Sequence, residues 1–238
     1  MTAWDSLKQS VLTTEQARRV DLVAMKKYHM HSLVLMENAA LGCVSWLKNR
    51  YSGQPKTLIV CGRGNNGGDG LVIARHLLAA GWDCRCLLLG PVVRLSADNL
   101  ANWEILNASC PSNVRLVEGE GAAADDLKQE IAEAELVIDA MLGTGVTGEP
   151  RFPFRKWIEW ANAHVAQRVA IDIPTGVNAE TGDVGERYFQ ADATLTFVAQ
   201  KPAMQLKETV KLFGDIEVCP IGLPAEMMEE ILGWSSGS

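Results

Sequence analysis

The sequence lacks several features that would place the chain in a specialised class. No apolar run approaches 18 residues, and the opening MTAWDSLKQS has no apolar signal core. We therefore expect neither a membrane span nor export. None of the six cysteines forms a Cys-x-x-Cys pair, which predicts buried, reduced thiols and fits a reducing cytoplasm. No linker rich in proline, glycine or serine divides the chain, so we expect one domain over residues 1–238, with an ordered core at about 12–232 and short tails.

A dense basic cluster is also missing. The 22 basic and 29 acidic residues give a formal net charge of −7. This balance disfavours nucleic acid as a partner, because phosphate backbones are bound by clustered lysine and arginine. An anionic small molecule would have to be bound locally, through backbone N–H groups or a bound cation.

Strand and helix patterns alternate along most of the chain. Thr13 and Gln16 form a capping-box pattern that predicts a helix to about Lys27, and Ser32 is a candidate N-cap of a second helix. Apolar strand patterns then alternate with helical ones, which is typical of a parallel sheet covered on both faces. The predicted strands are KTLIVCG, DCRCLLLG, VRLVEG, ELVIDA, QRVAID, ADATLTFVA and GDIEVCPIG.

Three polar loops follow predicted strands. They cover residues 62–70, 139–149 and 172–178, and each is rich in glycine, threonine, asparagine or aspartate. Because the carboxyl ends of parallel strands meet at one edge of a sheet, the three loops predict a single pocket.

The first loop, GRGNNGGDG, formally matches the dinucleotide-binding fingerprint. A dehydrogenase of that type carries an acid at the end of the next strand, but here that strand ends LLLGPVV. No Gly-Lys-Ser/Thr follows, so a P-loop is also excluded. The remaining alternatives are an anion-binding turn at a helix that begins near Gly70, or a tight turn without a ligand.

Asp139 and Asp172 each end an apolar strand, in LVID and VAID. A buried carboxylate must be hydrogen-bonded, paired or bound to a cation. Each aspartate could therefore cap its turn, hold a hard cation or move a proton. No cluster of histidine and cysteine suggests zinc, the four histidines fall away from these loops, and no Gly-x-Ser-x-Gly motif indicates a serine hydrolase.

Five segments of the chain, taken together, resemble a known family. The segments SLVLMENAA, GRGNNGGDG, DAMLGTG, DIPTGVNAETG and FVAQKPA occur in the order found in NAD(P)H-hydrate epimerases, the YjeF N-terminal domain family. The resemblance implies a three-layer αβα Rossmann-like sandwich with a mostly parallel central sheet and an N-terminal helical extension. It implies interconversion of the R and S hydrates of NADH and NADPH at the nicotinamide C6, as metabolite repair. A separate ADP- or ATP-dependent dehydratase would use the S form, since this chain ends too soon to include one.

The resemblance also implies roles for individual residues. Asp172 is the expected catalytic acid/base and also contacts substrate. Potassium is the expected ion, held by Asn66, Asp139 and Thr175. A homodimer through the two N-terminal helices is expected as well. The substrate-binding residues carried over are Asn65, Asn66, Gly67, Gly68 and Asp69, with the glycine amides near phosphate, and Gly143, Thr144, Gly145, Val146, Thr147, Gly148 and Glu149.

Two segments depart from the family pattern. Ala203 replaces the glycine of KPG, so that turn cannot need a left-handed glycine, and His29-Met30-His31-Ser32 replaces GIPS. The second change could alter the pocket rim or a dimer contact, and we expect neither to reach the polar core of the site. The competing functions are a non-catalytic ligand-binding or scaffold protein on the same fold, and a different isomerase of nucleotide sugars or phosphate esters.

Overall fold

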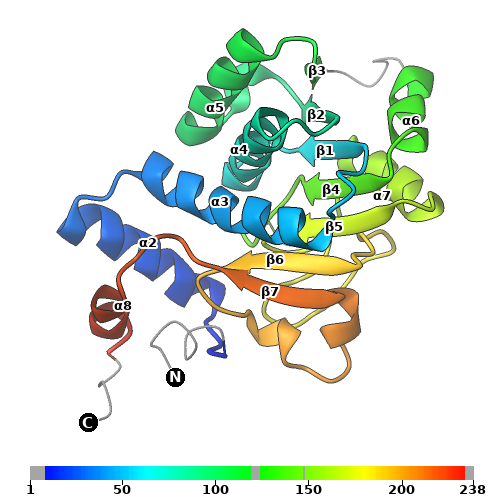
Figure 1. Cartoon of the computed structure of the whole chain (residues 1–238). Helices are drawn as coiled ribbons and strands as arrows, with labels where there is room; N and C mark the ends of the chain where they lie inside the picture. Colours follow the sequence, from blue (N-terminus) through cyan, green and yellow to red (C-terminus); the bar gives the residue numbers. More distant parts are fainter. Residues whose placement is uncertain (1–8, 119–123, 147, 234–238) are drawn as a thin grey trace.

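Seven strands form one parallel sheet in the computed structural model, which describes residues 9–118, 124–146 and 148–233 (Figure 1). The sheet order is β3-β2-β1-β4-β5-β6-β7, and every neighbouring pair is parallel. The predicted α/β class and parallel sheet are confirmed. The strands are β1 Thr57–Cys61, β2 Cys84–Leu89, β3 Val114–Val117, β4 Leu136–Ala140, β5 Gln167–Ile171, β6 Ala193–Phe197 and β7 Asp215–Cys219.

Helices cover both faces of the sheet. Ile59 and Ile138 pack toward α3, α4 and α5, whereas Val60 and Val137 pack toward Trp157 of α7. This alternation makes the three-layer sandwich, since successive strand residues point to opposite faces. The helices are α2 Thr14–Tyr28, α3 Ser32–Arg50, α4 Asn65–Ala79, α5 Ala97–Ser109, α6 Ala124–Ala132, α7 Phe154–Ala163 and α8 Ala225–Leu232, with short 3₁₀ turns at Val92–Arg94, Pro202–Met204 and Val210–Leu212.

The N-terminal helix α2 lies across the end of the sheet toward which the arrows of β6 and β7 point (Figure 1). The predicted capping box is present, because Thr13 accepts from the Gln16 amide and the Gln16 side chain accepts from the Thr13 amide. Val20 and Ala24 are fully buried in a cluster that includes Met228 of α8. The helix is therefore fixed at the edge of the sheet where the three polar loops leave their strands.

Two predicted helix starts are wrong. Ser32 is the first residue of α3 rather than its N-cap, and its hydroxyl donates to Asp98 at 2.9 Å. Helix α4 begins at Asn65 and not near Gly70. Glycine has a low helix propensity, but close packing overrides that preference here. A Cβ at Gly67 would lie 1.9 Å from the Gly62 carbonyl oxygen, and one at Gly70 would lie 2.6 Å from the Ala140 Cβ.

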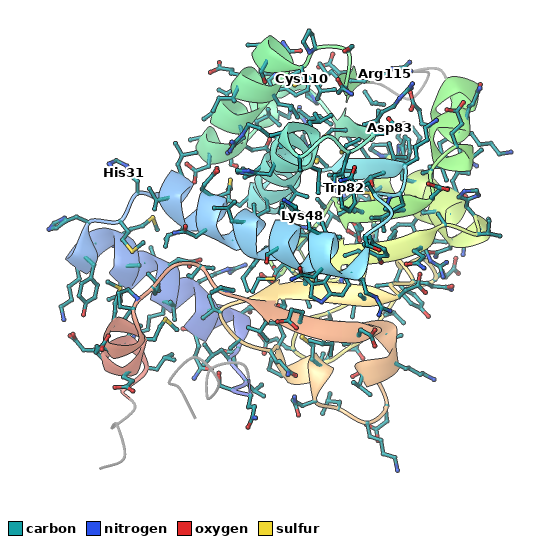
Figure 2. The ribbon with its side chains drawn as sticks, in the orientation of Figure 1. His31, Lys48, Trp82, Asp83, Cys110 and Arg115 are labelled. Atoms are coloured by element: carbon teal, nitrogen blue, oxygen red, sulfur yellow. The ribbon has the colours of Figure 1, made fainter. Side chains whose placement is uncertain are left out.

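The departure at His29–Ser32 has a local consequence. His29 closes α2 in the left-handed region, with φ 57°, a conformation in which glycine is the usual residue. The next histidine, His31, is exposed at the start of α3 and projects away from the ribbon (Figure 2). His29 therefore occupies a left-handed position that glycine would take without a steric cost.

We expect His29→Gly to raise the free energy of unfolding by roughly 0.5–1 kcal/mol, because it removes the left-handed strain of a residue with a Cβ. Lys26→Gly, three residues earlier in the same helix, is the matched control and should lower it by about 1 kcal/mol. Urea denaturation measures both. A loss of stability in His29→Gly contradicts this account.

Candidate functional site

A cleft of about 180 Å³ opens at the carboxyl end of the sheet. Its walls come from α2, the starts of α3, α4 and α5, and the loops after β4, β5 and β6. Acidic groups outnumber basic ones in it. The charged and amide side chains that line it are Arg18, Asp21, Asn65, Asp69, Asp98, Asp172 and Lys201.

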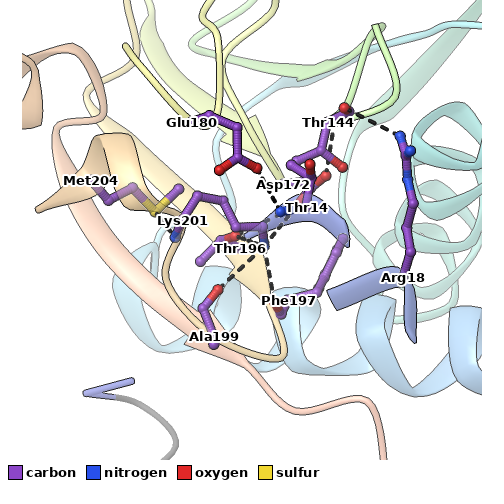
Figure 3. A network of polar contacts seen from close by, with 10 residues as sticks. All are labelled: Thr14, Arg18, Thr144, Asp172, Glu180, Thr196, Phe197, Ala199, Lys201 and Met204. Atoms are coloured by element: carbon purple, nitrogen blue, oxygen red, sulfur yellow. Dashed lines mark hydrogen bonds and ion pairs between the residues drawn. The ribbon is translucent and has the colours of Figure 1, made fainter. Parts of the chain in front are cut away.

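Asp172 is held at the end of β5 by contacts from three directions (Figure 3). Its Oδ2 accepts from the Thr144 amide at 3.2 Å, and its Oδ1 lies 3.2 Å from the Lys201 ammonium. The Thr196 hydroxyl lies 3.5 Å from the same Oδ1. The Asp172 side chain is 14% exposed, so it is packed into the protein yet still reaches the cleft. This arrangement fixes a carboxylate at a position where a ligand can contact it.

Lys201 is almost completely buried beside this carboxylate. Its side chain is 3% exposed, and the ammonium also donates to the Thr196 hydroxyl at 2.7 Å and to the carbonyl oxygens of Phe197 at 3.0 Å and Ala199 at 3.2 Å. A buried ammonium with its protons directed at four acceptors is a fixed positive charge rather than a free nucleophile. Lys201 therefore positions Asp172 and balances its charge.

Two residues at this edge have left-handed backbones. Asp172 has φ 64° and Val198, which follows β6, has φ 67°. A β-branched residue in this region is an outlier, and each such residue costs on the order of 1–3 kcal/mol. Both residues line the cleft. The adjacent ends of β5 and β6 thus hold strained backbone where Asp172 and Lys201 meet.

Asp139 is fully buried and ties two loops together. One oxygen accepts from the Met141 amide at 3.0 Å and from the Thr175 hydroxyl at 2.7 Å, and the other accepts from the Thr175 amide at 2.7 Å. The Leu142 amide in turn donates to the Thr175 hydroxyl at 3.0 Å. Burial raises the pKa of Asp139 to about 6, although these hydrogen bonds lower it.

The Asn-Asn-Gly-Gly-Asp segment forms the first turn of α4, and its members face different surroundings. Asn65 and Asp69 line the cleft, whereas Asn66 is 8% exposed and neither polar atom of its side-chain amide has a hydrogen-bond partner in the described part of the chain. The amides of Gly67 and Gly68 donate to the Gly64 carbonyl at 3.1 and 3.3 Å. The amides left without an intrahelical acceptor at this helix start are those of Asn65 and Asn66.

The predicted second loop is divided between two clefts. Thr144 lines the main cleft, and a Cβ built on Gly143 would lie 3.1 Å from Asp172 and 3.2 Å from Asn66. Val146, Gly148 and Glu149 line a neighbouring cleft of about 320 Å³, together with residues after β5. Gly145 lies near the Arg18 guanidinium, and Thr147 falls outside the described residues.

Three aspartates share the cleft with Asp172, and two of them, Asp21 and Asp69, have raised pKa values. Burial and, to a smaller extent, the Asp172 charge raise the pKa of Asp21 to about 6, against the lowering effect of Lys201. Burial raises the pKa of Asp69 well above its usual range, and the charges of Asp172, Asp21 and Asp98 add to that rise. The cleft therefore favours bound positive charge over additional negative charge.

Three side chains of this region were missed in the sequence. Asp21 shares the cleft-facing stripe of α2 with Thr14, Ala17, Arg18 and Met25, and this helical spacing was the available signal. Lys201 lies in the FVAQKPA segment, from which no site residue is predicted. Asn99 of α5 is fully buried and donates to the carbonyls of Gly62 and Gly64 at 3.0 and 2.7 Å.

The two departures from the family pattern differ in their effect. Ala203 lies in a right-handed 3₁₀ turn, which confirms that no left-handed glycine is needed there. Ser32 lines the cleft, which agrees with the expectation that the change at His29–Ser32 could alter the pocket rim.

Neither a metal cluster nor a membrane-spanning helix is found in the part of the chain that the structure describes. There, no three histidine, cysteine, aspartate or glutamate side chains come together as a metal site. A cation at the loops of Asn66, Asp139 and Thr175 would have to use amide and hydroxyl oxygens beside one carboxylate. The described helices include none long and apolar enough to span a bilayer.

Known proteins resemble this chain over nearly its full length. The family described as YjeF-related protein N-terminus matches residues 32–203. The NAD(P)H-hydrate epimerase of Pirellula staleyi is 38% identical over 94% of this chain and 97% of its own, and that of Rhodopirellula baltica is 36% identical over 92% and 87%. The bifunctional NAD(P)H-hydrate repair enzyme Nnr of Salinibacter ruber is 34% identical over 94% of this chain and 43% of its own. The crystal structure of yeast YNL200c superposes with a TM-score of 0.75 at 20% identity, covering 93% of both chains, and supports the fold.

We expect Gly67→Ala to lower the free energy of unfolding by about 1–3 kcal/mol, because its Cβ would overlap the Gly62 carbonyl and force the loop away from Asn99. Gly64→Ala is the matched control, since no atom lies within 4 Å of its added Cβ and its φ of −85° suits alanine. The control should change stability by less than about 1 kcal/mol. Equal losses in both variants, measured by urea denaturation, would show that close approach at Gly67 is not the constraint.

Proposed function

Because the chain belongs to the YjeF-related protein N-terminus family, we propose that it is an NAD(P)H-hydrate epimerase, an isomerase that interconverts the R and S hydrates of NADH and NADPH. The observation that carries this proposal is Asp172, a packed carboxylate oriented by the Thr144 amide and Lys201 at the wall of a cleft. The relatives that bear the epimerase name cover almost the entire chain.

The substrate explains why a carboxylate is useful. The hydrate carries a hydroxyl on C6, next to the ring nitrogen, so it is a carbinolamine. When the hydroxyl leaves as water, the nitrogen lone pair forms a C=N bond and the ring gains positive charge. C6 is then planar, and water can add to either face. A negatively charged cleft stabilises this cation more than the neutral hydrate, which is the requirement for catalysis.

Asp172 provides both electrostatic and proton-transfer functions in this scheme. Its carboxylate lies at the cleft with one oxygen bound to Lys201 and the other accepting from a single described donor, the Thr144 amide. On the face of the ring that it reaches, that second oxygen can give its proton to the departing hydroxyl when it is protonated, and it can take a proton from the water that adds to C6 when it is ionised. General acid–base catalysis of this kind contributes about 10²–10⁴-fold.

The start of α4 is the proposed site for the phosphates of the substrate. The backbone amides of Asn65 and Asn66, which have no acceptor among the described residues, lie at the positive end of a 15-residue helix dipole. The amides of Gly67 and Gly68 donate to the Gly64 carbonyl, so they are not the proposed phosphate donors. These two glycines contribute because their lack of a side chain lets the helix start pack closely. The loop from Gly143 to Glu149 forms the other side of the substrate site in this proposal.

A potassium ion is proposed at Asn66, Asp139 and Thr175. The buried side-chain oxygen of Asn66 has no partner among the described residues, as expected for a group that binds a ligand. Asp139 supplies negative charge, and carboxylate, amide and hydroxyl oxygens suit a hard cation. The ion would neutralise phosphate charge and order the loops after β4 and β5.

Partners and location are proposed on separate observations. The S hydrate would pass to a dehydratase, because relatives named as bifunctional repair enzymes join the epimerase-like part to a second part. Exposed Leu22, Leu33, Val34 and Leu41 on α2 and α3 support a homodimer through these helices, which a light-scattering mass of one chain would contradict. All six cysteines are unbridged, which supports a cytoplasmic location.

We expect Asp172→Asn to lower kcat for hydrate epimerisation by about 100-fold or more, since the amide keeps the shape but loses the charge and the proton. The measurement follows a purified R hydrate by chromatography as it equilibrates with the S form. Asp215→Asn is the control, because Asp215 is exposed at the amino end of β7.

The assay also separates the competing functions. An inactive wild-type protein that still binds the hydrates would favour the ligand-binding scaffold, and an inactive protein that binds neither hydrate would favour another substrate. Wild-type speed in Asp172→Asn would remove the assigned role of this residue without affecting the function.

We expect Asp139→Asn to raise the potassium concentration needed for half-maximal activity by about 10-fold or more, because the carboxylate charge is lost at the proposed ion. Thr175→Ser keeps the hydroxyl and is the control. Activity and thermal stability are titrated with potassium chloride at constant ionic strength held with choline chloride, since binding to the folded state raises Tm. An unchanged titration in Asp139→Asn contradicts the site.

A further inference from the structure

We propose that Asp21 of α2 is a second catalytic acid/base, which acts on the face of the nicotinamide ring that Asp172 does not reach. The inference rests on the proposed epimerase function and assigns this residue a part in it. The starting observation is that carboxyl groups from four separate elements line one cleft, and that two of these elements are α2 and the end of β5.

The position of Asp21 follows from the helical repeat. Thr14, Ala17, Arg18, Asp21 and Met25 all line the cleft, and their spacing places them on one face of α2. This helix is held at the cleft by the Thr14 amide, which donates to Glu180 at 2.6 Å, and by Arg18, which lies 3.5 Å from the Thr144 carbonyl (Figure 3). Asp21 is therefore part of the wall that α2 adds to the site.

The Asp21 carboxyl has no structural task that accounts for its position. Within the described residues, no hydrogen bond or ion pair holds it, and its half-buried side chain lines the cleft. A polar group without a partner in the wall of a cleft is available to a ligand. Asp172, in contrast, is bound by Lys201 and Thr144.

The surroundings of the two carboxyl groups differ in a way that suits two roles. Five charged groups share the cleft with Asp21: Arg18 on its own helix, Asp69 on α4, Asp98 on α5, Asp172 after β5 and Lys201 after β6. The Lys201 ammonium forms its ion pair with Asp172, not with Asp21. Burial and the Asp172 charge raise the pKa of Asp21 to about 6, so this group can both give and take a proton near neutral pH.

The reaction itself requires a group on each side of the ring. The hydroxyls of the R and S hydrates leave from opposite faces of the planar C6, and one fixed carboxyl can serve only one of them. In one direction, the protonated Asp21 gives its proton to the departing hydroxyl, the C–O bond breaks, and its electron pair leaves with water. Water then bonds to C6 from the other face, and the Asp172 carboxylate takes its proton. Solvent returns that proton to Asp21.

The test uses Asp21→Asn in the full chain, with Glu15→Gln as the matched control, because Glu15 lies on the same helix but is exposed outside the cleft. Epimerisation of purified R hydrate is followed by chromatography from pH 5 to pH 8. We expect kcat of Asp21→Asn to fall by about 100-fold while KM changes much less, and the limb of the wild-type profile near pH 6 to disappear. Glu15→Gln should match the wild type.

Stability separates a catalytic role from a structural one. The raised pKa means that ionised Asp21 opposes folding above pH 6, so Asp21→Asn should be at least as stable as the wild type at pH 8, by thermal unfolding. Asp21→Glu keeps a carboxyl and should retain more activity than the asparagine variant. If Asp21→Asn fails to fold, the wild-type profile decides, and the absence of a limb near pH 6 overturns the proposal.

The outcomes for Asp21 and for the function are distinct. An inactive wild-type protein contradicts the proposed function. An active wild type with an equally fast Asp21→Asn, and with the same pH profile in both, overturns the role of Asp21 and leaves the epimerase function intact.

Discussion

The buried contact between Lys201 and Asp172 is the interaction on which the site depends. Removing a lysine from water is costly, and the ammonium is stabilised here by one carboxylate, one hydroxyl and two backbone carbonyls. Those acceptors come from the ends of β5 and β6 and from the turn after β6, so the ion pair joins two strand ends. The left-handed residues Asp172 and Val198 persist at the same place, because the surrounding contacts determine their backbone.

The sheet and its order of elements could be predicted from the sequence, but the site could be predicted only in part. Apolar strands that alternate with helices specify a parallel sheet, and parallel strands bring Asp139 and Asp172 to one edge. The first turn of α4 could not be predicted, because its glycines indicate a loop by local propensity. They are helical since Gly67 packs against the Gly62 carbonyl, and such a contact is made only when the fold exists.

Asp21 and Lys201 illustrate a different limit. Neither residue belongs to a glycine-rich loop, and the sequence around each is also typical of a charged residue on the surface. Asp21 becomes part of the site because α2 packs against α3 and α8 and lies across the end of the sheet (Figure 1). Tertiary packing of a helix far from the loops in sequence decides which of its faces meets them, and amphipathic spacing alone does not say what that face contacts.

The glycine-rich segment at Asn65–Asp69 contributes to the site mainly because its glycines allow other parts of the chain to pack closely against it. Its two glycines allow α4 to begin deep against the strand ends, with Asn99 bound to the loop that precedes it. This packing buries the Asn66 side chain without a partner in the described chain and brings Asp69 beside Asp172 and Asp21. An unsatisfied amide and a crowded set of carboxyl groups both lower the stability of the fold, and a bound ligand would offset that cost. A cation near Asn66 and a substrate that becomes positively charged beside Asp172 would each do so.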